Sequence, residues 1–259
     1  MVTMFRLAVL LLLLSSCHRL SLPSRSSGAM TGRQFYNLAD SMKWAQREPI
    51  AQQEILAGNI PPFLRKLTPV HTSITDSTGR KIKAIFYVTP DYLSIGNKKD
   101  WARIPLTPMT AQTIADSLHC FLPTRKMVND IYTHATVKLE PVPLYAFRDS
   151  AITFRHHHLI IEGQRKGKKG LIAGIKKDVV SSGKITGRNV VIYGWHLLNG
   201  KPIQPLYGGH INWYVDYSHG IRLVSRIIKV NGRRMDYTEV LSHPVYRKLL
   251  SDEDSVRTY

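Results

Sequence analysis

The chain has 259 residues, 43% hydrophobic and 9% aromatic, and its 36 Lys and Arg against 18 Asp and Glu give a formal net charge of +18. Such a charge is typical of proteins that bind nucleic acid. The basic residues are scattered, however, and the densest run, residues 164–170, has glycines but no aromatic residue for base stacking. We therefore expect no nucleic-acid partner. The run is interpreted as a solvated loop, or as a site of attraction to anionic lipid headgroups or acidic cell-envelope polymer.

The N-terminal residues predict export. Arg6 precedes an apolar run over residues 7–14, which is too short to span a bilayer and lies where a secretory signal belongs. The run ends in Leu-Ser-Ser-Cys, which resembles the bacterial lipobox, so we expect a signal peptide over residues 1–16 and lipidation of Cys17. An ordinary cleaved signal peptide and an uncleaved anchor remain alternatives. The expected product is an exported lipoprotein, held on a membrane by its N-terminal lipid and facing the periplasm or the cell surface.

The rest of the chain divides into a tether and a domain. Residues 17–33 are rich in Ser, Arg and Gly and predict a lipidated flexible tether. Residues 34–259 are enough for a single α+β domain, with a sub-boundary considered near residues 145–155. Lipidation of Cys17 would leave Cys120 as the only thiol, so we expect no internal disulfide.

The first elements of the domain are helical. Apolar residues recur at helical spacing in residues 31–47, and a second helix is predicted over residues 49–56. Residues 70–95 then predict a β-hairpin, with its turn at Thr78-Gly79, followed by a short strand.

Two further helices are predicted over residues 110–118 and 125–135, and Thr124 is a suitable N-cap for the second. Cys120 lies in the connection between them. Residues 151–164 also predict a helix, which contains three consecutive histidines. Neighbouring helical residues point in different directions, so these histidines are a poor ligand set and are interpreted as a partly exposed turn.

The C-terminal half is mostly β. A closing helix is expected over residues 236–250, with a break considered at Pro244. The strand-like segments, rich in Val, Ile and Tyr, are residues 170–181, 189–196, 210–217 and 221–230. The sum predicts an α+β fold: N-terminal helices, then a mainly antiparallel sheet or partial barrel, with a helical insertion carrying Cys120.

Residues 193–222 hold a high density of polar and aromatic side chains. Groups that titrate near neutral pH are costly to place among apolar strands, so their clustering predicts a cleft. The connection between His196 and His210 is rich in Gly and Pro and is predicted to be a long loop, a common location for binding residues. The candidates are the catalytic groups His196, His210, Asp216 and His219 and the substrate-binding side chains Tyr193, Trp195, Tyr207, Trp213, Ser218 and Arg222.

A Cys–His site is the first interpretation. Cys120 would be the nucleophile, one of the three histidines would activate it, and Asp216 would orient that imidazole. Lys177 or Arg222 would bind a carboxylate or another anion. Because this chemistry suits acyl transfer, the expected function is a cell-envelope hydrolase of peptide or amide bonds, with peptidoglycan as a candidate substrate. The alternative for Cys120 is a packed hydrophobic residue.

Two other interpretations stay open, besides a lipoprotein that binds another envelope protein. A zinc-dependent hydrolase would use ligands from the same region, although the HExxH motif is absent; otherwise no cofactor is expected. A non-catalytic module would instead bind glycan or peptidoglycan on an aromatic platform. Ser218 is not in a GxSxG elbow and is expected to be a hydrogen-bond donor. The zinc ligands would be His196, His210, Asp216 and His219.

Residues 218–223, Ser-His-Gly-Ile-Arg-Leu, resemble the SHGCIRL signature of the L,D-transpeptidases, which are cell-wall enzymes with a β-rich fold and a catalytic cysteine. The cysteine between Gly220 and Ile221 is missing here, so the nucleophile of that family is absent. The upstream histidine of that family would correspond to His196.

The chain after Thr31 is also similar to a family of uncharacterised exported bacterial lipoproteins, a resemblance that implies no activity. Cys120 stands just before the first of the shared segments. These are LPTRKMV at 122–128, KKDVV at 176–180, YGWH at 193–196, PIQPLY at 202–207 and YVDYSHGIRLV at 214–224.

Overall fold

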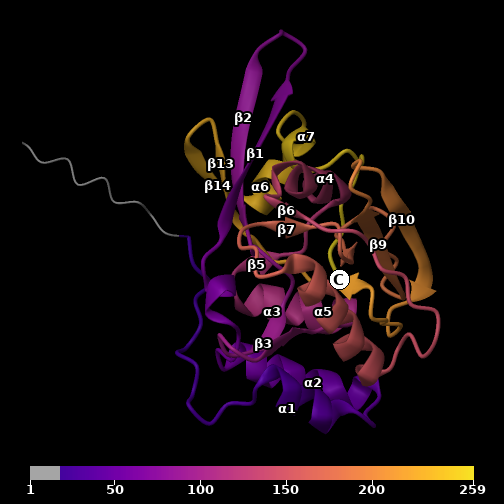
Figure 1. Cartoon of the computed structure of the whole chain (residues 1–259). Coiled ribbons are helices and arrows are strands. Elements are labelled where there is room, and N and C mark those ends of the chain that lie inside the picture. Colours follow the sequence, from indigo (N-terminus) through magenta and orange to yellow (C-terminus); the bar gives the residue numbers. More distant parts are fainter. Residues whose placement is uncertain (1–17) are drawn as a thin grey trace, which may run out of the picture.

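The computed structural model describes residues 18–259 (Figure 1). The expected signal peptide over residues 1–16 and the expected lipidation of Cys17 lie outside the described residues. The predicted α+β class is confirmed, because helices surround sheets that are mainly antiparallel. Within residues 18–259, no helix combines the length and the apolar character needed to cross a membrane.

The larger sheet has six strands in the order β14-β13-β2-β12-β5, with β1 paired to β2. Its centre is the predicted hairpin, whose two long strands project from the body in Figure 1. Alternate residues of β2 are buried, which fixes the register of the sheet. The strands are β1 (Thr68–Thr75), β2 (Lys81–Val88), β5 (Cys120–Phe121), β12 (Val224–Ser225), β13 (Ile227–Val230) and β14 (Arg233–Asp236).

The second sheet has the order β10-β9-β8-β11 and carries most of the candidate residues. Only its β8–β11 pair is parallel. The strands are β8 (Lys177–Val179), β9 (Asn189–His196), β10 (Pro202–Ile211) and β11 (His219–Gly220). The small sheets pair β3 (Ser94–Gly96) with β4 (Trp101–Arg103) and β6 (Val137–Lys138) with β7 (Ile172–Ala173).

The prediction of a long loop between His196 and His210 is wrong. Residues 202–211 form β10, so the connection is a hairpin with a short turn. Its prolines are compatible with a strand because β10 is the edge of the sheet, where an outward N–H is not needed. Similarly, the predicted strand over residues 170–181 is divided into β7 and β8, and Gly174 lies between them with φ +98°.

Helices cover the ends of both sheets. Thr31 and Gln34 form a capping box that begins the first helix, and Thr124 caps α4 as predicted. The predicted closing helix is divided at Pro244 into two short ones. The helices are α1 (Gly32–Ala39), α2 (Trp44–Leu56), the 3-10 turn η1 (Pro62–Arg65), α3 (Pro108–Ser117), α4 (Arg125–His134), α5 (Ala151–Arg165), α6 (Tyr237–Ser242) and α7 (Arg247–Leu250).

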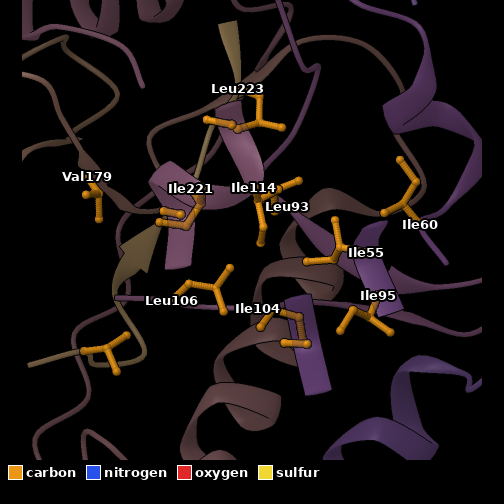
Figure 2. Packing of buried hydrophobic residues seen from close by; sticks show 14 of the residues in the cluster. Ile55, Ile60, Leu93, Ile95, Ile104, Leu106, Ile114, Val179, Ile221 and Leu223 are labelled. Carbon is orange, nitrogen blue, oxygen red and sulfur yellow. The ribbon is translucent and has the colours of Figure 1, made fainter. Parts of the chain in front are cut away.

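The largest hydrophobic core joins the helices to the strands. Figure 2 shows Ile55 of α2 and Ile114 of α3 among side chains from β3 and from the segment after β11, including Ile95 and Ile221. These four side chains are fully buried. Truncating one such side chain to alanine costs about 2–5 kcal/mol, so this cluster holds the N-terminal helices and the C-terminal segment in one body.

Residues 18–33 lie along the domain, whereas their composition predicted a flexible tether. Leu20 is buried in the main core. Arg65 donates hydrogen bonds to the carbonyls of Leu22 and Pro23, and Arg25 donates one to Asn59 at 2.7 Å. Arg65 thus satisfies backbone carbonyls of this segment, and Arg25 attaches the segment to Asn59 of the domain.

Candidate functional site

The catalytic candidates fall into three separate places. Asp216, Ser218 and His219 lie at the start of β11 and contact Lys177 of β8 and the Tyr214 segment. His196 lies on the other side of β9, against α4. Cys120 belongs to the larger sheet, where it pairs with Ser225. The Cys–His arrangement therefore has no common cleft.

Asp216 is the centre of the first group. Its carboxylate accepts hydrogen bonds from the Ser218 backbone N–H at 2.8 Å, the Ser218 hydroxyl at 2.6 Å, the Tyr214 hydroxyl at 3.0 Å and Arg148 at 2.7 Å. Burial alone would raise the pKa of Asp216, but the charge that His219 gains at acidic pH, the bonds from Ser218 and the charge of Arg148 hold this pKa well below its usual range. Ser218 is thus a hydrogen-bond donor to a carboxylate, as its surroundings in the sequence predicted, and is not paired with an imidazole.

His219 is buried beside this carboxylate. Its side chain is 1% exposed, and both ring nitrogens lack a hydrogen-bond partner among the described residues. Burial lowers the pKa of His219 to about 4, so the imidazole is neutral at pH 7. Tyr214 packs edge-on against it with ring centroids 5.8 Å apart, and His210 lies 4.5 Å from Tyr214. His210 and Tyr214 are half-buried and form the outer layer of the site.

Close packing around residue 220 requires a glycine directly after His219. A Cβ at this position would lie 2.5 Å from ring carbons of Tyr92 and 2.7 Å from the side chain of Lys176. Only glycine permits this close approach, so the Ser-His-Gly sequence fixes the position of His219 by backbone packing.

Lys177 and Trp195 form the floor of the site. Lys177 lies opposite His219 in the parallel pairing of β8 and β11, and its amine is 4.9 Å from the Trp195 ring centroid. Burial lowers the pKa of Lys177. Trp195 has φ +56°, which is strained for a tryptophan, and its indole Nε1 is buried with no hydrogen-bond acceptor in the described part of the chain. The buried ring nitrogens of His219 and Trp195 thus lie beside Lys177, and none of them has a hydrogen-bond partner within residues 18–259.

His196 belongs to a different group. Its Nε2 lies 3.0 Å from the Asn129 side-chain oxygen, and its ring stacks on Tyr132 at 4.6 Å. The Tyr193 hydroxyl donates to the same Asn129 oxygen at 2.9 Å. His196 and Tyr193 therefore attach β9 to α4.

Cys120 is a core residue. Its Sγ donates a 3.4 Å hydrogen bond to the Leu118 carbonyl, and no imidazole lies within hydrogen-bonding distance of it in residues 18–259. Burial raises the pKa of the Cys120 thiol to about 12. Such a thiol carries almost no thiolate at neutral pH and is a poor nucleophile.

Arg222 is an internal anchor, although it was expected to bind a ligand anion. It donates hydrogen bonds to the carbonyls of Thr89 at 3.0 Å and Ile172 at 2.7 Å, and its guanidinium lies 4.1 Å from the Tyr92 ring centroid. Asp178 is its counter-charge at 3.6 Å. Because these groups occupy the buried guanidinium, it does not face a ligand.

Tyr207 and Trp213 are the exposed aromatic candidates, with 41% and 49% of their surfaces accessible. The Tyr207 ring centroid lies 5.1 Å from that of His210, which places Tyr207 at the edge of the site. Trp213 lines a small hollow with Trp44 on the far side of Tyr214. The two rings therefore flank the His210–Tyr214 layer.

The zinc hypothesis lacks a complete ligand set. In residues 18–259 no three His, Cys, Asp or Glu side chains are placed to hold a metal ion. The His196 ring is directed toward Asn129 of α4 and not toward His219. The Asp216 oxygens already accept four hydrogen bonds.

Several residues that shape the site carry no recognisable signal in the sequence. Arg148, in an irregular segment before α5, is 68 positions from its partner Asp216. Lys176 is buried, donates to the Tyr217 carbonyl and lies 3.2 Å from His157 Nδ1. Burial lowers the pKa of Lys176 to about 7. The expected exposed histidine turn is therefore wrong for His157 and His158, which are buried.

No family model, curated protein or solved structure matches this chain. The resemblances to L,D-transpeptidases and to exported lipoproteins stay predictions.

Proposed function

We propose that this chain is an exported binding protein that recognises a carboxylate-bearing ligand of the cell envelope, such as the stem peptide of peptidoglycan. One observation carries the proposal: buried donors of His219 and Trp195 lack acceptors beside the amine of Lys177. Buried polar groups are normally paired, and an unpaired set suggests a ligand that completes it.

Charge favours an anionic ligand. Asp216 carries the one negative charge of the group and is already paired with Arg148 at 2.7 Å. Since His219 is neutral at pH 7, the charge of Lys177 is left in excess. A ligand carboxylate would accept hydrogen bonds from Lys177, from Trp195 Nε1 and from His219, and charge-assisted bonds of this kind are stronger than neutral ones.

Access requires a movement of Tyr214. Lys177 is 8% exposed and His219 1% exposed, and Tyr214 and His210 form the layer between them and solvent. The bond from the Tyr214 hydroxyl to Asp216 would break in this movement, and a ligand would have to compensate for it. Tyr207 and Trp213 beside this layer would contact the rest of the ligand.

Hydrolysis of a peptide or amide bond is the second candidate. A neutral His219 next to Asp216 has the form of a general base, and its free ring nitrogens would activate a water. In this version the nucleophile is water, because Cys120 lies in another part of the fold. Attachment to a membrane through a lipid on Cys17 belongs to both candidates.

The test is calorimetric titration of soluble peptidoglycan fragments into the protein. Lys177→Met removes the charge but keeps the apolar stem over Trp195, and Lys201→Met, at an exposed turn, is the matched control. We expect binding by the wild type and the control and about tenfold or greater weakening by Lys177→Met. Equal binding by all three would contradict the proposal. Mass spectrometry of the same mixtures detects cleavage, which His219→Gln would abolish if the second candidate holds.

A further inference from the structure

A second cavity, remote from Lys177, lies beside the start of β1. It has a volume of about 820 Å³ and is enclosed by η1, β4, the C-terminal end of α5 and the residues before β7. This volume is in the range of small-molecule sites. Its walls are largely apolar and are formed by Pro62, Phe63, Leu67, Pro69, Pro90, Trp101 and Ile172.

Positive charge surrounds these apolar walls. Lys66, Lys98 and Lys169 are exposed at the cavity, and no carboxylate lies within 4.0 Å of their amines in residues 18–259. The one carboxylate of the lining, Asp91, is neutralised by two hydrogen bonds from Arg103, at 2.9 and 2.6 Å. The cavity therefore keeps an excess of cations.

Arg165 is the fourth cation and is held in place. Its Nε donates to the Lys168 carbonyl at 2.6 Å, and its guanidinium lies 5.5 Å from the Phe63 centroid and 5.6 Å from the Trp101 centroid. Among the described residues its ionic partner is Glu162, at 3.3 Å. A guanidinium held in one position at the edge of an apolar cavity can bind the anionic head group of a ligand without further ordering.

We propose that this cavity binds an amphiphilic anion: an apolar chain that enters between Phe63 and Ile172, with a carboxylate or phosphate head among Lys66, Lys98, Lys169 and Arg165. The apolar walls favour a ligand with an apolar chain over a purely ionic one, and the lysines favour an anionic head over a neutral one. The basic run over residues 164–170 then has a function beyond solvation, because it supplies Arg165 and Lys169.

The first described residues of the chain lie beside this cavity. Lys66 pairs through its backbone with Arg19, and Leu67 donates its N–H to the His18 carbonyl at 2.8 Å. Residue 18 therefore lies next to the cavity lining. A protein held on a membrane through its N-terminus would present this cavity to anionic lipids.

The test uses the full chain with Cys17→Ser, so that no lipid is attached at that position. Calorimetry compares decanoate, decyl phosphate, 1-decanol and inorganic phosphate. We expect both chain-bearing anions to bind, and 1-decanol and inorganic phosphate to bind at least about tenfold more weakly. Stronger binding of decyl phosphate indicates a phospholipid-type head, and stronger binding of decanoate a fatty acid.

Charge is removed in a matched pair of variants. Lys66→Gln/Lys98→Gln/Lys169→Gln alters three exposed side chains at the cavity, and Lys184→Gln/Lys201→Gln/Lys248→Gln alters three exposed ones elsewhere. The first should weaken decyl phosphate about tenfold or more, and the second less than about twofold. No binding by either anion, equal binding of 1-decanol, or equal effects of the two triple variants would overturn the proposal.

Discussion

Replacing Arg222 tests whether it is an internal anchor or a ligand contact. Arg222→Met keeps a long apolar stem over Tyr92 but removes the donors to the Thr89 and Ile172 carbonyls and leaves Asp178 without its counter-charge. Breaking one partner of a buried ion pair costs about 3–5 kcal/mol. The control is Arg226→Met, four residues later, whose pair with Asp236 at 3.0 Å is about one-third exposed and should cost at most about 1 kcal/mol.

The stability lost in Arg222→Met should depend on pH through Asp178. Burial raises the pKa of Asp178 to about 6. A carboxyl with a raised folded-state pKa binds more protons when folded, so its contribution to stability declines as pH rises from its ordinary pKa of 3.8 through about 6. Without Arg222 this pKa rises further, so the deficit of the variant should be larger at pH 7 than at pH 5.

Urea unfolding followed by circular dichroism measures both effects. Arg222→Met/Asp178→Asn removes the unpaired charge and should be more stable than Arg222→Met alone at pH 7. The reasoning is refuted if Arg222→Met unfolds like the wild type and instead loses ligand binding, because Arg222 would then act at the site.

Three other predictions concern the described residues. The thiol of Cys120 should react with a disulfide reagent only as fast as the protein unfolds, and Cys120→Ala should leave ligand binding intact; rapid reaction of the folded protein would revive a catalytic cysteine. Because the pKa of His219 is lowered in the folded protein, its contribution to stability is present above the usual histidine pKa and is lost as pH falls from about 6.5 to about 4. His219→Gln should therefore flatten the decline of the unfolding free energy between these pH values. An unchanged slope would show that the imidazole is not buried in its neutral form. Leu20→Ala should cost about 2–5 kcal/mol in urea unfolding, and a negligible cost would return residues 18–33 to the status of a tether.

Local patterns predicted the elements well. Thr124 and its helix, and the hairpin of β1 and β2, follow from capping and turn chemistry within a few residues. The edge strand β10 was missed because Pro202 and Pro205 suggest a loop until the strand's position in the sheet is known. Position within a sheet depends on distant segments, which one sequence does not reveal.

The site was predicted in part for the same reason. The grouping of His210, Asp216 and His219 follows from their closeness in the chain. The separation of His196 depends on side-chain direction: its ring turns toward Asn129 and Tyr132 of α4. Arg222 and Cys120 look like reactive groups by residue type, and only their burial and hydrogen-bond partners show them to be internal.

The most direct test of the proposed function compares two forms of one ligand. A peptidoglycan stem peptide is titrated into the wild-type protein with its C-terminal carboxylate free, and again with that carboxylate converted to an amide. If Lys177, His219 and Trp195 complete their hydrogen bonds with a carboxylate, the acid should bind about tenfold or more tightly than the amide, and the difference should become smaller in Lys177→Met, which lacks the charged donor. Equal affinity for acid and amide in the wild type would contradict the account.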